Sequence, residues 1–153
     1  TQVATVGLVR FEPNLVNVVP AKVTMTVDLR NTDEMVLRDA EARFRALCDS
    51  SAAAENVTFA SRPLARFEPV EFDAHMVDLV EATAHRLGCS TMRMPSGAGH
   101  DAQMLARVCP TAMVFVPSVN GLSHNIAEYT HPADITSGAN VLLQVVLAKA
   151  SEV

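Results

Sequence analysis

Apolar and polar residues alternate strictly along Lys22–Arg30, where valine, methionine and leucine occupy one side and threonine, aspartate and arginine the other. A period of two is typical of a half-buried antiparallel strand. Residues 3–9 predict a preceding strand, and Pro13 and Asn14 begin the turn that joins the two. The chain is therefore expected to open with a pair of strands before any helix.

A helical period follows these strands. Asp33 and Glu34 suit a helix N-terminus, because carboxylates are favourable at the positive end of the helix dipole. The expected inner face consists of four residues at helical spacing, which are Val36, Ala40, Phe44 and Leu47. The helix is expected to stop before residues 50–55, which are expected to be a breaker, and residues 57–59 are expected to form a third strand. The first portion thus predicts strand, strand, helix, strand, an α+β arrangement.

From residues 68–72 onward the pattern changes to helices and strands in alternation, which predicts an α/β layer. Asp73 is expected to cap a helix, and Gly88 suits the left-handed residue after its C-terminus. The predicted inner stripe of that helix is Met76, Val80, Ala84 and Leu87. The elements expected next are a strand at 90–94, a helix at 101–108, a strand at 111–116 and a helix at 133–150 with Ile135, Val141, Leu142 and Val145 inward.

Composition narrows the class of protein. Of the 153 residues, 49% are apolar and the net charge is −5, which predicts a globular domain without a basic surface for nucleic acid. Cys48, Cys89 and Cys109 form no CxxC pair, so a reducing cytoplasm is expected. No apolar stretch is long enough to predict membrane attachment. The strand-like start without methionine predicts a fragment of a longer polypeptide.

Two loops, residues 94–103 and 120–128, each follow a predicted strand and carry a histidine among small residues. Ligands of open α/β sheets bind beyond the carboxyl ends of strands, which is where both loops are expected. Gly97-Ala98-Gly99 is weak by itself, since a tight turn with a helix cap explains it equally well, but His100 strengthens a functional interpretation. In the second loop, Glu128 is close enough in sequence to orient the ring of His124.

A lone histidine is usually structural, and a catalytic zinc centre needs at least three protein ligands. The chain has no HxD, HExxH or paired-glutamate motif, and it also lacks GxSxG, GxGxxG and P-loop patterns. On the expected strand, Arg30 suits bidentate capture of a carboxylate, although an ion pair with a neighbouring acid explains it too. Asn17 would either present its amide to a ligand or tie down the turn.

Four ordered motifs together resemble the amidase/hydantoinase/carbamoylase group of dizinc hydrolases, which includes N-carbamoyl-L-amino acid hydrolase and allantoate amidohydrolase. They are Pro13-Asn14-x-x-Asn17-Val18-Val19-Pro20, Asp28-x-Arg30, Ser96-Gly97-Ala98-Gly99-His100-Asp101-Ala102, and Gly121-x-Ser123-His124-Asn125-x-x-Glu128. The chain resembles the C-terminal part of such an enzyme. The resemblance implies that residues 1–67 belong to an α+β lid that forms a homodimer, and residues 68–153 to the end of an aminopeptidase-like catalytic α/β layer.

The same resemblance implies the roles of five residues. His124 would be a metal ligand, Asn17 and Arg30 would hold the substrate carboxylate, and Gly99 and His100 would line the substrate pocket. The complete site would contain two ions, zinc or else manganese or cobalt, and would hydrolyse a linear amide, carbamoyl or ureido bond of a small molecule. Closure of the lid would exclude water from that reaction.

The departures from the family pattern are equally informative. The first histidine ligand, the bridging aspartate, the glutamate pair and the lid histidine are missing from this chain. No catalytic residue is therefore expected in this chain, because the general base would lie upstream. The fragment alone is expected to be inactive and to bind no metal. Two alternatives stay open, namely a non-catalytic binding or dimerisation module and an aminoacylase or peptidase of the same clan.

Overall fold

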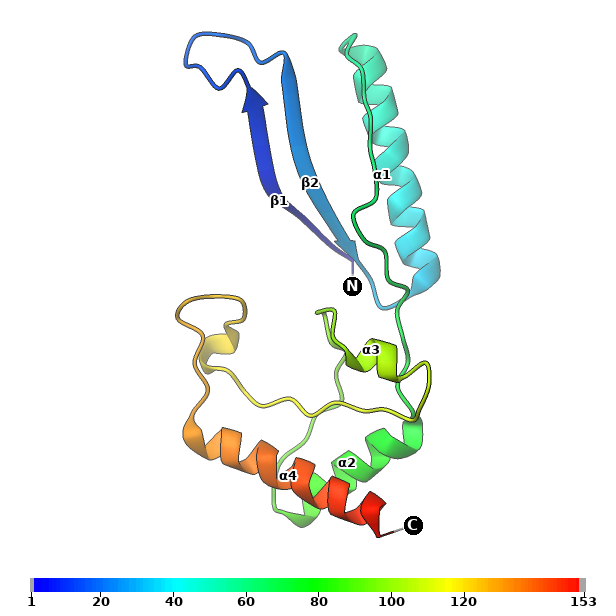
Figure 1. Ribbon diagram of the computed structural model, residues 1–153, viewed down its shortest axis with the longest axis vertical. Coiled ribbons are helices and arrows are strands. Elements are labelled where there is room, and N and C mark those ends of the chain that lie inside the picture. The colour runs from blue at the N-terminus through cyan, green and yellow to red at the C-terminus, as the bar shows by residue number, and fades with distance from the viewer. Residues whose placement is uncertain (1, 152–153) are drawn as a thin grey trace. The chain divides into compact units, whose positions relative to one another are not determined.

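The computed structural model describes residues 2–151 and has a mixed α/β fold (Figure 1). Its elements are β1 (Val3–Glu12), β2 (Lys22–Arg30), α1 (Glu34–Ala54), α2 (Ala74–Arg86), α3 (Ala102–Leu105), the 3₁₀ turn η1 (Val119–Gly121) and α4 (Pro132–Ala150). The chain divides into two compact units. The first extends to Pro69 and includes Pro95–Ala98, and the second contains Val70–Met94 and the residues from Gly99 onward.

The first unit is built on an antiparallel hairpin. β2 has the bounds that its alternation predicts, whereas β1 continues three residues beyond the expected end at residue 9. The pairing runs from Val3 opposite Arg30 to Glu12 opposite Lys22, with an irregularity between Val6 and Leu8. Val23, Met25, Val27 and Leu29 of β2 share one face with the β1 residues opposite them, because side chains alternate across a sheet, whereas Val3 and Leu8 lie on the other face. α1 contacts β2.

α1 begins where the sequence predicts, but a different residue is most buried. The Asp33 carboxylate accepts hydrogen bonds from the backbone N–H groups of Met35 and Val36, a normal N-cap arrangement. Leu37 is only 4% exposed, whereas Val36 is 46% exposed. The expected inner face was therefore wrong at Val36, and also at Leu47, which is exposed. The hairpin decides which side of this helix is covered, and the apolar pattern on α1 is broad enough to allow either side.

The predicted end of α1 was also wrong, because the helix continues through residues 50–54. Three alanines occupy Ala52–Ala54, and alanine has the highest helix propensity of all residues. The helix ends at Ala54 with Glu55 as its C-cap, and the next residue, Asn56, has a left-handed φ of 51°. The N–H of Val57 then reaches the carbonyl of Ala52, and that of Asn56 reaches Ala53, which together form a Schellman motif.

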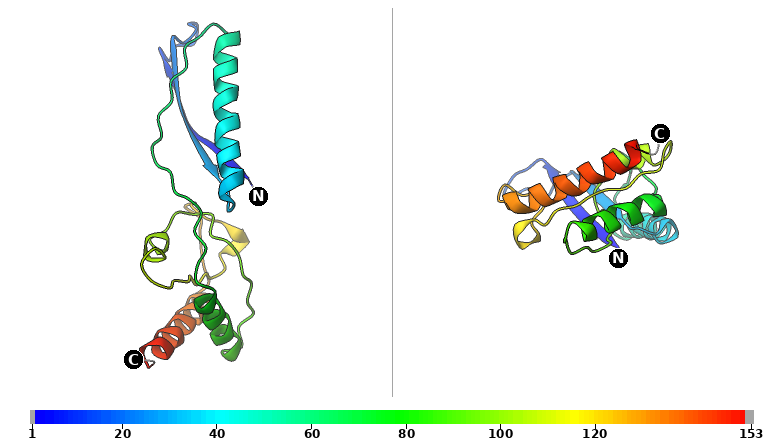
Figure 2. Two further views of the ribbon diagram at one scale, coloured as in Figure 1. Left: turned by 90° about the vertical axis from the view of Figure 1, so that its right-hand side faces the viewer. Right: turned by 90° about the horizontal axis from the view of Figure 1, so that it is seen from below.

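Residues 57–59 are not a strand, contrary to the prediction, because this segment pairs with no strand among residues 2–151. It runs back along α1 instead (Figures 1 and 2). Side chains hold it there: the guanidinium of Arg45 lies 5.5 Å from the ring centroid of Phe59 and donates to Oγ of Ser61 at 2.8 Å. Contacts with side chains of α1 thus replace the backbone hydrogen bonds of a sheet.

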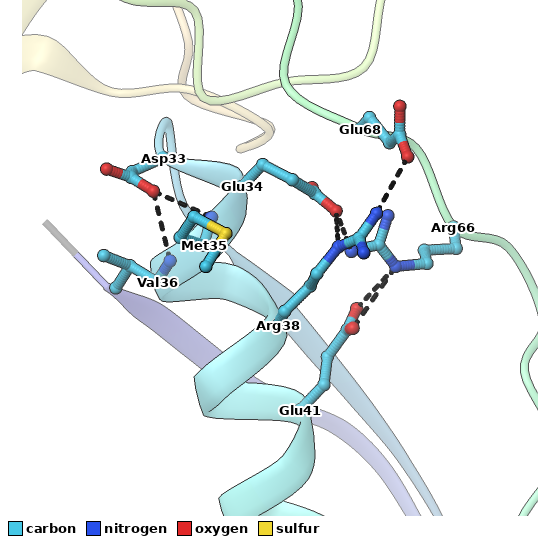
Figure 3. Close-up of polar contacts among 8 residues, drawn as sticks. All are labelled: Asp33, Glu34, Met35, Val36, Arg38, Glu41, Arg66 and Glu68. Atoms are coloured by element: carbon cyan, nitrogen blue, oxygen red, sulfur yellow. Dashed lines mark hydrogen bonds and ion pairs between the residues drawn. The ribbon is translucent and has the colours of Figure 1, made fainter.

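Further along the same segment, an ion-pair network joins it to the first turns of α1 (Figure 3). Arg66 contacts Glu34 at 2.7 Å and Glu41 at 3.0 Å. Arg38 contacts the same oxygen of Glu34 at 2.5 Å and Glu68 at 3.4 Å. Two arginines therefore meet at one carboxylate, which makes Glu34 the centre of the network.

Acid should loosen this attachment. Hydrogen bonds from Arg38, and next from Arg66, hold the pKa of Glu34 below its ordinary value of 4.5. A carboxyl group whose pKa is lowered by folding stabilises the folded state above its unfolded pKa, and this contribution is lost as the pH falls through the folded pKa. We therefore expect the midpoint temperature of unfolding to decrease as the pH falls below about 4.5. This decrease should be steeper in the parent chain than in Glu34→Gln.

Circular dichroism of both chains between pH 7 and pH 3 measures this effect. The difference in unfolding midpoint between parent and Glu34→Gln should shrink as the pH falls. Glu55→Gln is the control, because Glu55 is the C-cap at the other end of the same helix and forms no ion pair among residues 2–151. A Glu34→Gln difference that stays constant over the whole range would contradict the assignment.

The second unit has its core between α2 and α4, which pack against each other (Figures 1 and 2). Ala84 of α2 and Val141 and Val145 of α4 are buried, and Val114 packs against them. The prediction was right for these helical residues, but Leu87, Ile135 and Leu142 are exposed. No helix within residues 2–151 is both long and apolar enough to cross a membrane.

The caps of α2 agree with the sequence. The Asp73 carboxylate accepts from the N–H of Met76 at 2.9 Å. Gly88 has a φ of 76°, so the predicted left-handed residue is confirmed. The N–H of Cys89 reaches the carbonyl of Ala84 at 3.0 Å and completes a second Schellman motif.

Three predicted elements of this unit were wrong or too long. Residues 90–94 and 111–116 lie outside any strand, because neither segment forms a backbone ladder with another within residues 2–151. Strand assignment depends on such pairing, whereas the apolar pattern records only burial. The helix expected at 101–108 is reduced to the single turn of α3.

Gly138 of α4 lies against Val116 and has no room for a side chain. A Cβ at Gly138 would overlap Cγ1 of Val116, well inside the 3.0 Å limit that real Cβ atoms respect. We expect Gly138→Ala to lower the free energy of unfolding by roughly 1–3 kcal/mol, although alanine in a helix is normally more stable than glycine. Urea unfolding of the chain measures the change.

The double variant Gly138→Ala, Val116→Ala tests whether the clash is the cause. Removing Cγ1 of Val116 makes space for the new methyl group, so the second substitution should cost less in the Gly138→Ala background than in the parent. Additive costs, or a Gly138→Ala chain as stable as its parent, would show that the contact is relaxed in solution.

Candidate functional site

Arg30 is the last residue of β2, and each of its three guanidinium nitrogens donates a hydrogen bond within the first unit. Nε and Nη2 donate to the carboxylate of Asp28, the latter at 2.6 Å, and Nη1 donates to the carbonyl oxygen of Gly97 at 2.6 Å. The ion pair that explains Arg30 without a ligand is therefore present. Both side chains are 49% exposed, so solvent and ligands can still reach them.

The electrostatics of this pair are reciprocal. Hydrogen bonding to Arg30 holds the pKa of Asp28 below its ordinary 3.8, and the carboxylate raises the pKa of Arg30. Both groups are consequently charged at neutral pH. A substrate carboxylate arriving at Arg30 would meet a guanidinium that already has one carboxylate partner.

Asn17 lies in the turn that joins β1 to β2, and it is exposed. This turn is next to Lys22, whereas Arg30 is at the other end of the same strand. Eight residue steps of about 3.3 Å separate Lys22 from Arg30, or roughly 26 Å. The structure thus places Asn17 and Arg30 on one hairpin but at its opposite ends.

In the first loop, residues 94–103, neither backbone conformation nor crowding requires glycine at Gly97 or Gly99. Neither Gly97 nor Gly99 adopts a left-handed φ. A Cβ at Gly97 would meet nothing within 4 Å, and one at Gly99 would make only an ordinary contact of 3.7 Å with Gln103. The remaining physical reason for glycine at such a position is close approach of a ligand or another backbone.

His100 has a defined ring orientation. Its Nδ1 accepts a hydrogen bond from the backbone N–H of Ala102 at 3.1 Å, and the backbone N–H of His100 donates to Oε1 of Gln103 at 3.4 Å. An Nδ1 that accepts leaves the proton of the neutral ring on Nε2. His100 is exposed, so this Nε2–H can donate to an external acceptor.

His124 has an unusual backbone. Its φ is 54°, a left-handed conformation that is uncommon outside glycine and marks many functional positions. Nδ1 lies 3.1 Å from Oγ of Ser123, and Nε2 has no hydrogen-bond partner among residues 2–151. In the tautomer in which Nδ1 donates its proton to Oγ of Ser123, Nε2 offers a free lone pair to a metal ion.

The expected role of Glu128 was wrong. Its Oε2 accepts from the backbone N–H of His124 at 2.8 Å and does not contact the ring. Glu128 therefore holds the strained backbone, and Ser123 has the ring contact that was assigned to Glu128. The sequence analysis includes Ser123 in the fourth motif but assigns it no role, and its position beside the histidine was the signal for this contact.

A complete metal centre does not fit the residues at hand. Within residues 2–151 there is no group of three or more His, Cys, Asp or Glu side chains placed to hold a metal ion. Structural and catalytic zinc sites need at least three protein ligands. The described part of the chain therefore supplies at most single ligands, with His124 the best prepared.

Comparison with known proteins identifies the family. The model of peptidase family M20/M25/M40 matches residues 3–148. N-carbamoyl-L-amino-acid amidohydrolase of Rhizobium meliloti is 41% identical over 148 residues, which are 97% of this chain and 36% of that protein. Allantoate amidohydrolase of Escherichia coli K12 is 41% identical over 144 residues, 92% of this chain and 34% of that protein. The chain thus spans about a third of these relatives.

The fold agrees with the sequence match. A crystal structure of an amidase of the hydantoinase/carbamoylase family from Burkholderia vietnamiensis superposes with a TM-score of 0.93 at 44% identity, covering 97% of this chain and 36% of that one. The mixed α/β fold class and the resemblance to the carbamoylase group are both confirmed. On the match that extends over nearly its whole length, the chain belongs to peptidase family M20/M25/M40.

Proposed function

We propose that this chain is part of a longer metal-dependent amidohydrolase that cleaves linear amide, carbamoyl or ureido C–N bonds in small carboxylated molecules. The observation that carries the proposal is the 41% identity, over nearly all of the chain, to both an N-carbamoyl-amino-acid and an allantoate amidohydrolase. Both names describe hydrolysis of a C–N bond next to an amino-acid-like carboxylate. We therefore expect the substrate to be a small molecule that has such a C–N bond next to a carboxylate.

His124 would be a metal ligand in the complete protein. The free Nε2 and the Ser123 contact at Nδ1 support this role, because ligating histidines normally hydrogen-bond through their other nitrogen. Bound zinc or manganese supplies polarisation of a carbonyl and activation of water in hydrolases of this kind. The other ligands and the general base would come from residues outside this chain.

Arg30 and Asn17 would bind the substrate carboxylate, and their separation predicts how. One carboxylate is too small to reach both ends of a nine-residue strand. We therefore propose that the enzyme is a homodimer in which Arg30 of one copy and Asn17 of the other serve the same substrate. This proposal requires the first unit to form the dimer contact, in agreement with its predicted place in a lid domain, residues 1–67.

Gly99 and His100 would face the substrate. Neither conformation nor crowding within the chain requires glycine at Gly99, and His100 beside it offers an Nε2–H donor. Both features suit the close approach of a carbonyl or ureido group. In this role His100 donates a hydrogen bond to a substrate oxygen, and the backbone of Gly99 allows the substrate to lie against the loop.

A second candidate applies to the chain taken alone, namely a non-catalytic binding or dimerisation module. The lack of a three-ligand cluster within residues 2–151 favours it. Metal analysis separates the two: a chain that binds zinc tightly and stoichiometrically, and loses it on substitution of His124, would contradict the module.

The activity itself is tested with the complete polypeptide that contains this chain. Purified with added zinc, manganese or cobalt, it should hydrolyse N-carbamoyl amino acids or allantoate and release ammonia or the free amino acid, and a chelator should abolish this. Acylated amino acids and dipeptides form the comparison panel, since activity on them alone would indicate an aminoacylase or peptidase. A metal-loaded enzyme that is inactive on every substrate would refute the proposal.

A further inference from the structure

Asp28 and Arg30 lie on the same face of β2, because residues two apart in a strand point to the same side. Oδ1 of Asp28 accepts from Nε at 3.0 Å, and Oδ2 accepts from Nε at 3.1 Å and from Nη2 at 2.6 Å. The carboxylate thus occupies the side edge of the guanidinium, which is the edge formed by Nε and Nη2.

The opposite part of the guanidinium stays available. Asp28 uses two of the five guanidinium N–H donors, which leaves both on Nη1 and one on Nη2; one donor on each of these nitrogens forms the end edge that can bind a carboxylate with two parallel bonds. One of these donors already engages an oxygen from another segment, since Nη1 reaches the carbonyl of Gly97 at 2.6 Å. One donor on Nη1 and one on Nη2 thus remain for an incoming acceptor.

The backbone of Arg30 is held too. Nε2 of Gln2 donates to the carbonyl oxygen of Arg30 at 3.1 Å, and Nδ2 of Asn31 donates to Oε1 of Gln2 at 3.2 Å. With the backbone fixed by Gln2 and the side edge fixed by Asp28, the guanidinium has little freedom to rotate. Preorganisation of this kind reduces the entropy lost when a ligand binds.

We infer that Asp28 is a positioning residue for substrate binding, which acts by occupying the Nε/Nη2 edge of Arg30 and directing the Nη1/Nη2 edge toward the substrate carboxylate. This inference rests on the proposed function, in which Arg30 binds that carboxylate. The ion pair is half exposed, and pairs of that exposure add little to stability. Its value would lie in orientation rather than in holding the hairpin together.

The test uses the complete metal-loaded enzyme and its carbamoyl or ureido substrate. Asp28→Asn keeps the size of the side chain but places an amide N–H₂ against the Arg30 donors. KM should rise about tenfold or more, as expected for loss of a charge-assisted hydrogen bond, while kcat and the midpoint of thermal unfolding change little. Asp28→Glu, which keeps the carboxylate, should recover part of the loss in KM.

Asp49→Asn is the matched control, because Asp49 also pairs with an arginine, Arg45, at comparable exposure on α1. It should leave KM unchanged. An unchanged KM in Asp28→Asn would overturn the inference, and a lowered KM would show that Asp28 competes with the substrate. Failure of the proposed function looks different, since the parent enzyme would then be inactive.

Discussion

In the complete enzyme, His124→Asn is expected to lower kcat/KM by about 10³-fold or more, equivalent to roughly 4 kcal/mol of transition-state stabilisation. The imidazole Nε2 is the best-prepared metal donor of the described residues, and an asparagine amide is a much weaker ligand for zinc. Asparagine is chosen because it tolerates the left-handed backbone that His124 adopts, with φ 54°. The loss should therefore come from the metal site and not from a disturbed loop.

Metal content, measured by mass spectrometry alongside kcat/KM, separates the two causes. We expect fewer bound ions per protomer in His124→Asn and an unchanged unfolding midpoint of the metal-free protein. His85→Asn is the control, because His85 is an exposed histidine whose Nε2 is 2.7 Å from Thr91 and which has no expected ligand role. Full activity of His124→Asn with a full complement of metal would rule out the ligand assignment.

The second large effect concerns substrate binding by Arg30 and Asn17. Arg30→Ala and Asn17→Ala should each raise KM, the arginine variant by about 10²-fold, because it loses a bidentate charged contact. Their positions at opposite ends of the hairpin predict that the two defects can complement each other. In a mixed dimer of the two variants, one site would combine the intact Arg30 of one copy with the intact Asn17 of the other.

Equal co-expression of the two variants and random pairing give mixed dimers as half of all dimers. In each mixed dimer, one of the two sites is intact. Activity should therefore recover to about a quarter of the parent value at a substrate concentration near the parent KM. Mixing the variants after purification without subunit exchange is the control and should recover nothing. Lack of recovery in verified mixed dimers would show that both residues act within a single copy, or that one of them does not touch the substrate.

Local signals explain what was predictable about the fold. The alternation of Lys22–Arg30 gave the bounds of β2, the carboxylates of Asp33 and Asp73 marked two helix starts, and Gly88 marked a helix end. Each of these features depends on residues within one or two turns of each other. Physical rules for propensity and capping act at that range.

Failures occurred where an element depends on distant partners. The apolar segment at 111–116 supplies Val114 to the core of the second unit without joining a ladder. Residues 57–59 carry strand-forming side chains, yet they lie along α1 because Arg45 contacts Phe59 and Ser61. Hydrophobic periodicity indicates that a side chain is buried, but it does not indicate which backbone segment lies next to that residue.

The candidate site divides in the same way. His124, His100, Gly99, Arg30 and Asn17 were predicted from motifs, and their roles stay predictions. The contacts that give these residues chemical character were not predictable: the ring of His124 against Ser123, the backbone of His124 against Glu128, and the guanidinium of Arg30 against the carbonyl of Gly97. Each depends on a loop conformation or on a contact between residues far apart in the chain.

The sequence alone determined the family, the first strand pair, the helix caps and the identity of the candidate residues, since these are recorded in residue types at short spacing. Only the tertiary structure decided that Leu37 is buried in place of Val36, that Glu34 joins two arginines, and that Arg30 donates to the carbonyl of Gly97. The physical reason is that packing, ion pairing and separation in space are set by chain segments meeting, and a local pattern cannot specify that meeting.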